Sequence, residues 1–370
     1  MGNGPHTVVV GAGITGAFAA YFLALSQNRV TLVDPFDGAN ASNRNVGGLN
    51  PLHGIPGPLR DLAMASLRMH LQHGDSLHRL SGIDFGGRFT DRLHIAIGAA
   101  EFGDLAVREE LHNAEAGFSA ELLSTGRAGA IAPGLSPDVA GALLTTRNAR
   151  VEPDRYTRAV TEAAVRLGAE RVRGHVTDLL VRAGRVTGVR VGERELPCDA
   201  VVIASGPWCT APSGWLGIDL PVTPVKGELL LVELGRARPT IEITWDRFGI
   251  YPCSPRWAWL GGTEETTGLA CEPTTQARNR ILEAVADTVP GIGPLRVVEH
   301  VAGVRPVTPG GLPLVGLVEP HDNVCVALGG GRKGMLLAPA MALAAADLIT
   351  RGTTDMPIPP LSLGRAGVDA

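Results

Sequence analysis

Hydrophobic and polar positions along the chain predict a strand, a helix and a second strand close to the start. Residues 7–10 form a continuous apolar run, which is typical of a strand buried in a parallel sheet. Residues 14–26 are rich in alanine and leucine and have the length of a helix, and residues 29–33 form a second apolar run. This order is that of a nucleotide-binding α/β unit.

The same patterns predict further elements along the chain. Helices are expected over 59–80, over most of 105–124, and from Pro153 to near Gly168, with a strand over 89–98. Residues 200–204 read as a buried strand followed by Gly206, residues 223–299 as mostly alternating strands, and residues 323–349 as strand, glycine loop and helix. We expect the last residues, rich in proline and glycine, to form a frayed tail.

Three glycines follow the first strand in GxGxxG spacing, at positions 11, 13 and 16. The first permits a tight turn, the second lets a phosphate approach the backbone, and the third lets the helix pack on the sheet. Asp34 ends the second strand, where its carboxylate can accept hydrogen bonds from ribose hydroxyls, and an acid here disfavours NADP. A glycine turn without a ligand is the alternative. The pattern predicts a dinucleotide site without separating NAD from FAD.

A long loop of small residues, "GANASNRNVGGLNPLHGIPGPL", follows Asp34. Long loops in compact domains are usually functional or disordered. Ser42, Asn45, Gly47 and Gly48 offer a hydroxyl, an amide and bare backbone. We therefore expect phosphate and ring contacts here, with a mobile surface loop as the alternative.

Composition excludes several classes of protein. The length of 370 residues favours two or three domains, and a net charge of −4 without a basic run gives nucleic-acid binding little support. Five scattered cysteines without a CxxC pair make a metal site or a disulfide framework improbable and fit a reducing compartment. We find no signal peptide, and the longest apolar stretch is too short to cross a bilayer. These features predict a cytoplasmic protein with no metal.

Four blocks of sequence resemble the D-amino-acid oxidase superfamily of flavoproteins, in its glycine oxidase and sarcosine oxidase branch. They are "VVVGAGITG…VTLVD", "VEPDRYTRAVTEAAVRLGAE", "DAVVIASGPW" and "GVRPVTPGGLPLVG…ALGGGRKGMLLAPAMALAAADLI". The resemblance implies FAD and an α/β fold, in which a Rossmann-like FAD-binding domain (1–80, 146–225 and 300–370) is interleaved with an antiparallel-sheet substrate domain (81–145 and 226–299).

The resemblance also implies cofactor contacts. The ADP half would be held by Gly11, Ala12, Gly13, Ile14, Thr15, Gly16, Asp34 and Pro35. The flavin would lie beside Ser42, Asn43, Gly47, Gly48 and Leu49. Val176 would use its backbone at the adenine, and Ser205, Gly206 and Trp208 would border the cofactor. The pyrimidine end of the ring would be lined by Gly330, Gly331, Arg332, Lys333, Gly334 and Met335, where the amides of the following helix favour negative charge.

For the substrate, the resemblance implies that Arg305 grips a carboxylate with two parallel hydrogen bonds. Arg332 matches a family arginine near flavin and substrate, and Tyr251 lies close to a family tyrosine whose hydroxyl meets the carboxylate. The alternatives are an ordinary ion pair for Arg305, a structural hydrogen bond to loop carbonyls for Arg332, and core packing for Tyr251. Asn50 and His53 are further candidates for the pocket, although a histidine in a polar loop is more often simply hydrogen-bonded or solvated.

The implied reaction oxidises the C–N bond of an amino acid or N-substituted amino acid. The Cα hydrogen would leave as hydride to flavin N5, and water would hydrolyse the imine, with oxygen or another acceptor reoxidising the flavin. Alternatives are FAD-dependent oxidation of a 2-hydroxy acid, a noncatalytic flavin-binding subunit, and an NAD-dependent dehydrogenase, which would lack the final glycine block.

The chain departs from the sarcosine oxidase pattern at three places. Near the place of a lysine that activates oxygen stands Trp259. The stretch "VAGVRP" lacks the cysteine that often tethers FAD, so the cofactor is expected to be noncovalent. Gly330 and Gly331 replace an aromatic residue and a histidine, which predicts a roomier pocket.

Overall fold

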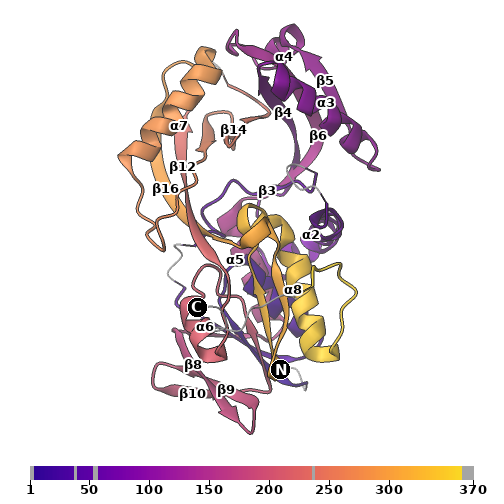
Figure 1. The fold of residues 1–370 in the computed structure, drawn as a ribbon, viewed down its shortest axis with the longest axis vertical. Coiled ribbons are helices and arrows are strands. Elements are labelled where there is room, and N and C mark those ends of the chain that lie inside the picture. The colour runs from indigo at the N-terminus through magenta and orange to yellow at the C-terminus, as the bar shows by residue number, and fades with distance from the viewer. Residues whose placement is uncertain (1–3, 37–39, 53–56, 236–237, 361–370) are drawn as a thin grey trace, which may run out of the picture.

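The computed structural model describes residues 4–36, 40–52, 57–235 and 238–360. Two layers of sheet are stacked along the long axis of the molecule (Figure 1). The helices within these residues are α1 (Ile14–Leu25), α2 (Leu59–Ser81), α3 (Ala99–Asn113), α4 (Thr125–Ile131), α5 (Pro153–Arg166), α6 (Thr210–Leu216), α7 (Thr275–Thr288) and α8 (Gly334–Arg351).

The lower layer is a six-stranded sheet. Its order is β17 (Leu314–Val318), β18 (His321–Leu328), β11 (Ala200–Ile203), β1 (His6–Val10), β2 (Arg29–Asp34) and β7 (Glu170–Arg173). All neighbouring pairs are parallel except β17 with β18. The strand order reverses between β1 and β11, which is where doubly wound sheets bind ligands at the carboxyl ends of their strands.

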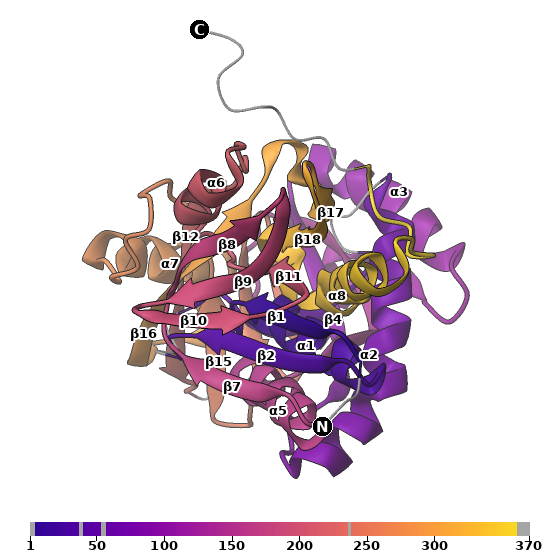
Figure 2. The same ribbon diagram turned by 90° about the horizontal axis from the view of Figure 1, so that it is seen from below.

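Both faces of this sheet are covered, which explains its continuous apolar strands. Val9 and Val202 point to one side and share a core with α1, α2, α5 and α8. Val8 and Val201 point to the other side and pack against a small antiparallel sheet of β8 (Val176–Arg182), β9 (Arg185–Val191) and β10 (Arg194–Pro197). Figure 2 shows this small sheet from below, in front of the six-stranded one.

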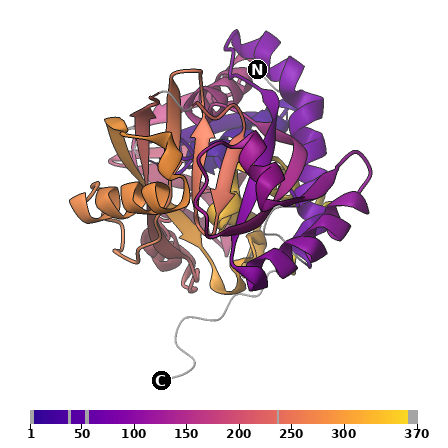
Figure 3. The same cartoon turned by 90° about the horizontal axis from the view of Figure 1, so that it is seen from above.

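The upper layer is a nine-stranded sheet. Its order is β16 (Arg296–Val307), β12 (Thr223–Glu233), β15 (Trp257–Gly261), β14 (Phe248–Pro252), β13 (Glu242–Trp245), β4 (Arg88–Ile97), β6 (Val139–Arg150) and β3 (Gly48–Leu49), with β5 (Ala120–Ser124) beside β6. Leu230 and Val232 pack on one face against Ile281 and Val285 of α7. Figure 3 shows the orange α7 at one edge of this layer. The opposite face looks toward the six-stranded sheet.

The structure confirms the predicted α/β fold class and most of the predicted elements, with two differences. Helix α7 lies within residues 223–299, where mostly strands are predicted. The helix expected over most of 105–124 ends at Asn113, and Ala120–Ser124 is strand β5. This segment gains backbone hydrogen bonds from β6, a partner that its own apolar pattern does not reveal. Of the four predicted domain boundaries, one falls at the end of α2 and three fall inside β6, β12 and β16, so single strands join the two layers. The division into domains stays a prediction.

Helix α8 is the longest apolar segment among the described residues. Gly331–Arg351 is long and apolar enough to cross a membrane by length and composition. Of its apolar window, 61% is buried, because α8 packs against α1 and α2 in the core. We therefore describe it as a core helix. The tail predicted for the last residues falls mostly on 361–370, which lie outside the described residues.

Candidate active site

A cavity of about 710 Å³ lies between the two layers. Its floor is formed where the strands β1, β11 and β18 end, at Gly11, Ala204 and Gly329. Its roof includes Arg92 of β4 and Tyr251 of β14, from the face of the nine-stranded sheet that α7 leaves open. The volume is within the range of about 300–1,000 Å³ typical of cofactor and ligand sites.

At one end of the cavity the glycine turn has the predicted geometry. Gly11 has a φ of +100°, and a Cβ there would come within 2.4 Å of the carbonyl oxygen of Ala204. A Cβ at Gly16 would lie 1.8 Å from the carbonyl oxygen of Gly11, so the helix packs directly on the turn. Gly13 lines the cavity, and the amide of Ile14 donates to Ser42 Oγ at 2.9 Å.

Asp34 is held rigidly at the same end. Its Oδ2 accepts from the amide of Ala12 at 2.7 Å and its Oδ1 from the amide of Phe36 at 2.6 Å. Each carboxylate oxygen retains a lone pair for a ribose hydroxyl. A bare phosphate-binding turn, a helix N-terminus and a fixed acid fit the ADP half of FAD, and the cavity continues from them to the opposite glycine loop.

At the other end, the first turn of α8 is held by a neighbouring helix. Pro339 has no N–H, so the carbonyl of Met335 lacks its helical donor. His70 of α2 supplies one: its Nε2 lies 3.1 Å from Met335 O and 3.0 Å from Leu336 O, and its Nδ1 lies 2.6 Å from the Tyr156 hydroxyl. Burial lowers the pKa of His70 to about 4, so the ring is neutral and donates through Nε2.

Arg305 lies on the cavity wall in a groove made by glycine. Arg305 lies on β16, which pairs with β12. Its Nη2 lies only 2.1 Å from the position that a Cβ would take at Gly227 of β12. Its Nη1 donates to Thr263 O and to Glu264 Oε1, each at 3.3 Å. Arg332 Nη1 lies 3.3 Å from the same oxygen of Glu264. Burial and the neighbouring Arg332 lower the pKa of Arg305, which remains a cation.

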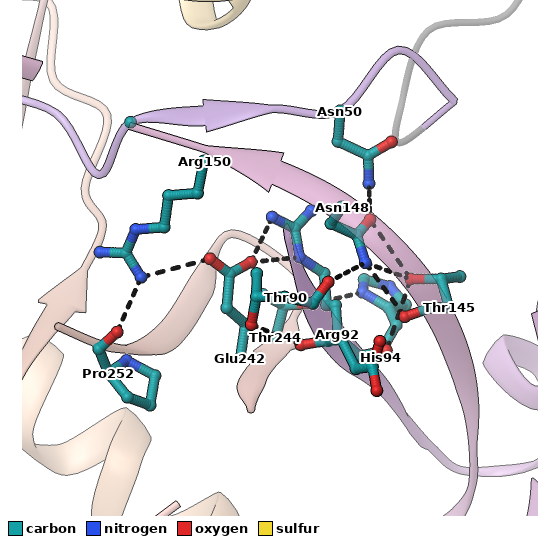
Figure 4. A network of polar contacts seen from close by, with 12 residues as sticks. Asn50, Thr90, Arg92, His94, Thr145, Asn148, Arg150, Glu242, Thr244 and Pro252 are labelled. Atoms are coloured by element: carbon teal, nitrogen blue, oxygen red, sulfur yellow. Dashed lines mark hydrogen bonds and ion pairs between the residues drawn. The ribbon is translucent and has the colours of Figure 1, made fainter. Parts of the chain in front are cut away.

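Tyr251 faces the cavity beside a second charged network. Glu242 binds Arg92 at 2.8 Å through Nε, and Arg150 lies 3.3 Å from its other oxygen (Figure 4). The Arg150 guanidinium lies 5.9 Å from the centre of the Tyr251 ring. Burial raises the pKa of Tyr251, so its hydroxyl is protonated and can donate. Figure 4 also shows Asn50, which is buried and donates to Asn148 while lining the cavity.

The cavity brings most of the expected residues together. Its lining includes Gly11, Gly13, Ile14, Thr15, Asp34, Pro35, Ser42, Gly48, Asn50, Val176, Ser205, Gly206, Trp208, Tyr251, Arg305, Gly330, Gly331, Arg332, Lys333, Gly334 and Met335. Five expected residues do not line it but support the turns behind it: Ala12, Gly16, Asn43, Gly47 and Leu49. His53 lies outside the described residues.

Sequence reasoning missed part of the substrate end. Arg92 lines the cavity from β4, and Gly227 makes room for Arg305. A charged residue at an inward-facing position of a strand was the available signal for Arg92. Trp259, expected near the place of the family lysine, is not among the described residues that line the cavity, and Gly261 and Gly262 of that segment line it instead.

Comparisons with known proteins show the family of the chain. The family model "DAO: FAD dependent oxidoreductase" matches residues 6–348, and the chain belongs to this family. Glycine oxidase of Pseudomonas putida is 29% identical, covering 98% of this chain and 99% of that protein. The crystal structure of glycine oxidase from Geobacillus kaustophilus superposes with a TM-score of 0.90 at 27% identity, covering 98% and 99% of the two chains.

L-proline dehydrogenase from P. horikoshii shares the fold, with a TM-score of 0.84 at 21% identity over 96% of each chain. The predicted family, the FAD cofactor and the oxidoreductase class are thereby confirmed.

Proposed function

We propose that the chain oxidises the C–N bond of an amino acid or an N-substituted amino acid, with noncovalent FAD as its cofactor, in the cytoplasm. The observation that carries the proposal is the guanidinium of Arg305 on the cavity wall, across from the glycine turn of the dinucleotide site. The similarity to glycine oxidases supports an amino acid as the donor. None of the five cysteines, all of which lie in the described segments, lines the cavity, which supports a noncovalent cofactor.

The residues of the chain bind and orient the substrate. Arg305 would offer the nitrogens that Glu264 does not occupy, Nη2 and Nε, to the substrate carboxylate, and the Tyr251 hydroxyl, from the same cavity, would donate to it. The acceptor for the hydride that leaves Cα would be supplied by bound FAD. The glycine turn at Gly11 and Gly13 would hold the phosphates, and the first turn of α8 would direct its amides at the ring. Holding the donor in one orientation lowers the barrier by several kcal/mol.

An anaerobic screen tests the proposal. FAD-loaded protein is mixed with D- and L-amino acids, N-methyl amino acids and 2-hydroxy acids, and the loss of yellow absorbance is followed. We expect reduction by at least one amine, with release of ammonia or a smaller amine. Reduction by hydroxy acids alone would establish the alternative 2-hydroxy acid oxidation. A flavin that no donor reduces would favour a noncatalytic flavin-binding subunit.

A further inference from the structure

Lys333 lines the cavity, and its side-chain amine has no described partner. It lies at the end of the glycine loop, directly before α8, and its side chain is partly buried. Over the residues that the structure describes, no hydrogen bond or ion pair joins its Nζ to another group. Its backbone amide donates to Gly330 O at 3.0 Å.

The other cations at this end of the cavity already have carboxylate partners. Arg305 and Arg332 share Glu264, and Arg92 is paired with Glu242. Each of these groups keeps a surplus of positive charge, because Glu264 serves two arginines and Glu242 serves Arg92 as well as a second arginine, Arg150. The cavity wall at the substrate end is therefore cationic beyond what one substrate carboxylate would neutralise.

The surroundings of Lys333 disfavour an unpaired positive charge. Burial, together with the charges of Arg92, Arg332 and Arg108, lowers the pKa of Lys333 to about 7. Its position at the N-terminus of the 18-residue helix α8 adds the positive end of the helix dipole. An anionic group next to the amine would offset all of these effects at once.

The choice of lysine at this position is unusual for this chain. Of its 33 basic residues, two are lysines, Lys226 and Lys333. Lys226 is buried and bound to Glu228 at 2.8 Å and to Glu265 at 3.0 Å. Lys333 is thus the lysine left for a ligand, and its flexible stem can follow ligands of different length.

The space beside Lys333 is also available. Gly331 has no side chain, and the nearest described atom to a Cβ built there is Pro306 O, at 3.9 Å. Tyr251, Arg92 and Arg332 line the same cavity as Lys333. Arg305 and Lys333 line the same cavity, so a ligand with two acidic ends can meet both residues.

We propose that Lys333 is a specificity-determining residue that binds a second carboxylate, so that the preferred substrates are amino dicarboxylic acids. The inference rests on the proposed function, in which Arg305 holds the carboxylate next to the amine. The backbone of the loop serves the cofactor, while the Lys333 side chain serves the substrate.

Equilibrium binding tests this without catalysis. Succinate and butyrate, which carry no oxidisable amine, are titrated calorimetrically into the FAD-loaded parent, Lys333→Met and Lys333→Arg. We expect the parent to bind succinate roughly tenfold or more tightly than butyrate, Lys333→Met to lose that difference, and Lys333→Arg to retain most of it. Equal affinity of the parent for both acids would overturn the proposal. Far-UV circular dichroism and flavin content show whether each variant has folded and kept its FAD.

Substrate pairs separate this inference from the proposed function. D- and L-aspartate and glutamate are compared with asparagine and glutamine, which have the same shape without the second charge. We expect the acids to reduce the flavin faster in the parent, and Lys333→Met to remove the preference. If neutral amino acids reduce the flavin and the acids do not do so faster, the inference fails alone. If no amine reduces it, the proposed function fails. If Lys333→Met slows flavin reduction equally with every substrate, or slows only the reoxidation of the flavin, Lys333 would act on the flavin rather than on the substrate.

Discussion

The Nη1 atom of Arg305, which lines the cavity, lies 3.3 Å from the Oε1 atom of Glu264. A carboxylate of the protein therefore lies against the guanidinium that is proposed to bind the carboxylate of the substrate. A ligand must share Arg305 with Glu264 or displace it, so Glu264 lowers the affinity of the site for acids.

Removing this competing charge should strengthen the binding of acids. We expect Glu264→Gln to bind butyrate about two- to fivefold more tightly, because a partly exposed ion pair contributes about 0.2–1 kcal/mol. Calorimetric titration of the FAD-loaded protein measures the change. Glu272→Gln, an exposed position with the same change of charge, is the control. Weaker binding in Glu264→Gln would show that Glu264 orients Arg305 rather than competing for it.

Replacing Arg305 should weaken the binding of the substrate and leave the binding of FAD unchanged. Hydrogen bonds to charged groups contribute about 1.5–3 kcal/mol, so Arg305→Ala should raise KM for a carboxylated amine by roughly ten- to a hundredfold. Arg305→Lys should recover part of this loss, because an ammonium cannot form two parallel bonds. Fluorescence titration with FAD should give an unchanged Kd. Unchanged kinetics on every carboxylated substrate would remove Arg305 from this role.

A substitution at Gly227, which lies under Arg305, should also weaken substrate binding. A methyl group at position 227 would occupy the place of Arg305 Nη2, so Gly227→Ala should move the guanidinium and raise KM while leaving FAD affinity unchanged. Gly103→Ala, where nothing lies within 4 Å of the added Cβ, is the matched control and should behave as the parent. Equal KM values for the two variants would contradict the described position of Arg305.

The buried His70 predicts that the folded protein becomes less stable in acid. Its folded pKa of about 4 lies below the ordinary value of 6.5, so the unfolded chain binds the proton more readily. The contribution of the neutral His70 ring to the free energy of unfolding is complete above about pH 6.5. It is lost as the pH falls toward 4, and the largest possible loss is about 3 kcal/mol.

His70→Gln keeps a donor for the carbonyl of Met335 and should lose less unfolding free energy between pH 7 and pH 4 than the parent does. Urea unfolding at both pH values measures this, with the exposed His78→Gln as the control. An identical pH dependence of the parent and His70→Gln would contradict the assignment.

Local signals made much of the fold predictable. The turn at Gly11 and Gly16 and the helix after it depend on residues close together in the sequence, and the structure has both as predicted. The final glycine loop and α8 were predictable for the same reason.

Pairing between distant segments was not predictable. Glu242 binds Arg92 across 150 positions of sequence, and Gly227 lies under Arg305 only because β12 pairs with β16 in one register. Neither relationship leaves a periodic pattern in either segment. The charge environment of Lys333 likewise depends on Arg92 and Arg108, which lie far from it in the sequence, as well as on the adjacent Arg332.

The most direct test of the central claim is the stoichiometry of one anaerobic turnover. FAD-loaded protein is mixed with an amine that reduces it, and reduced flavin, keto acid and released ammonia or amine are measured together. We expect equal amounts of all three products, and flavin that leaves the protein on acid precipitation. Reduction of the flavin without release of any amine would contradict oxidation at the C–N bond.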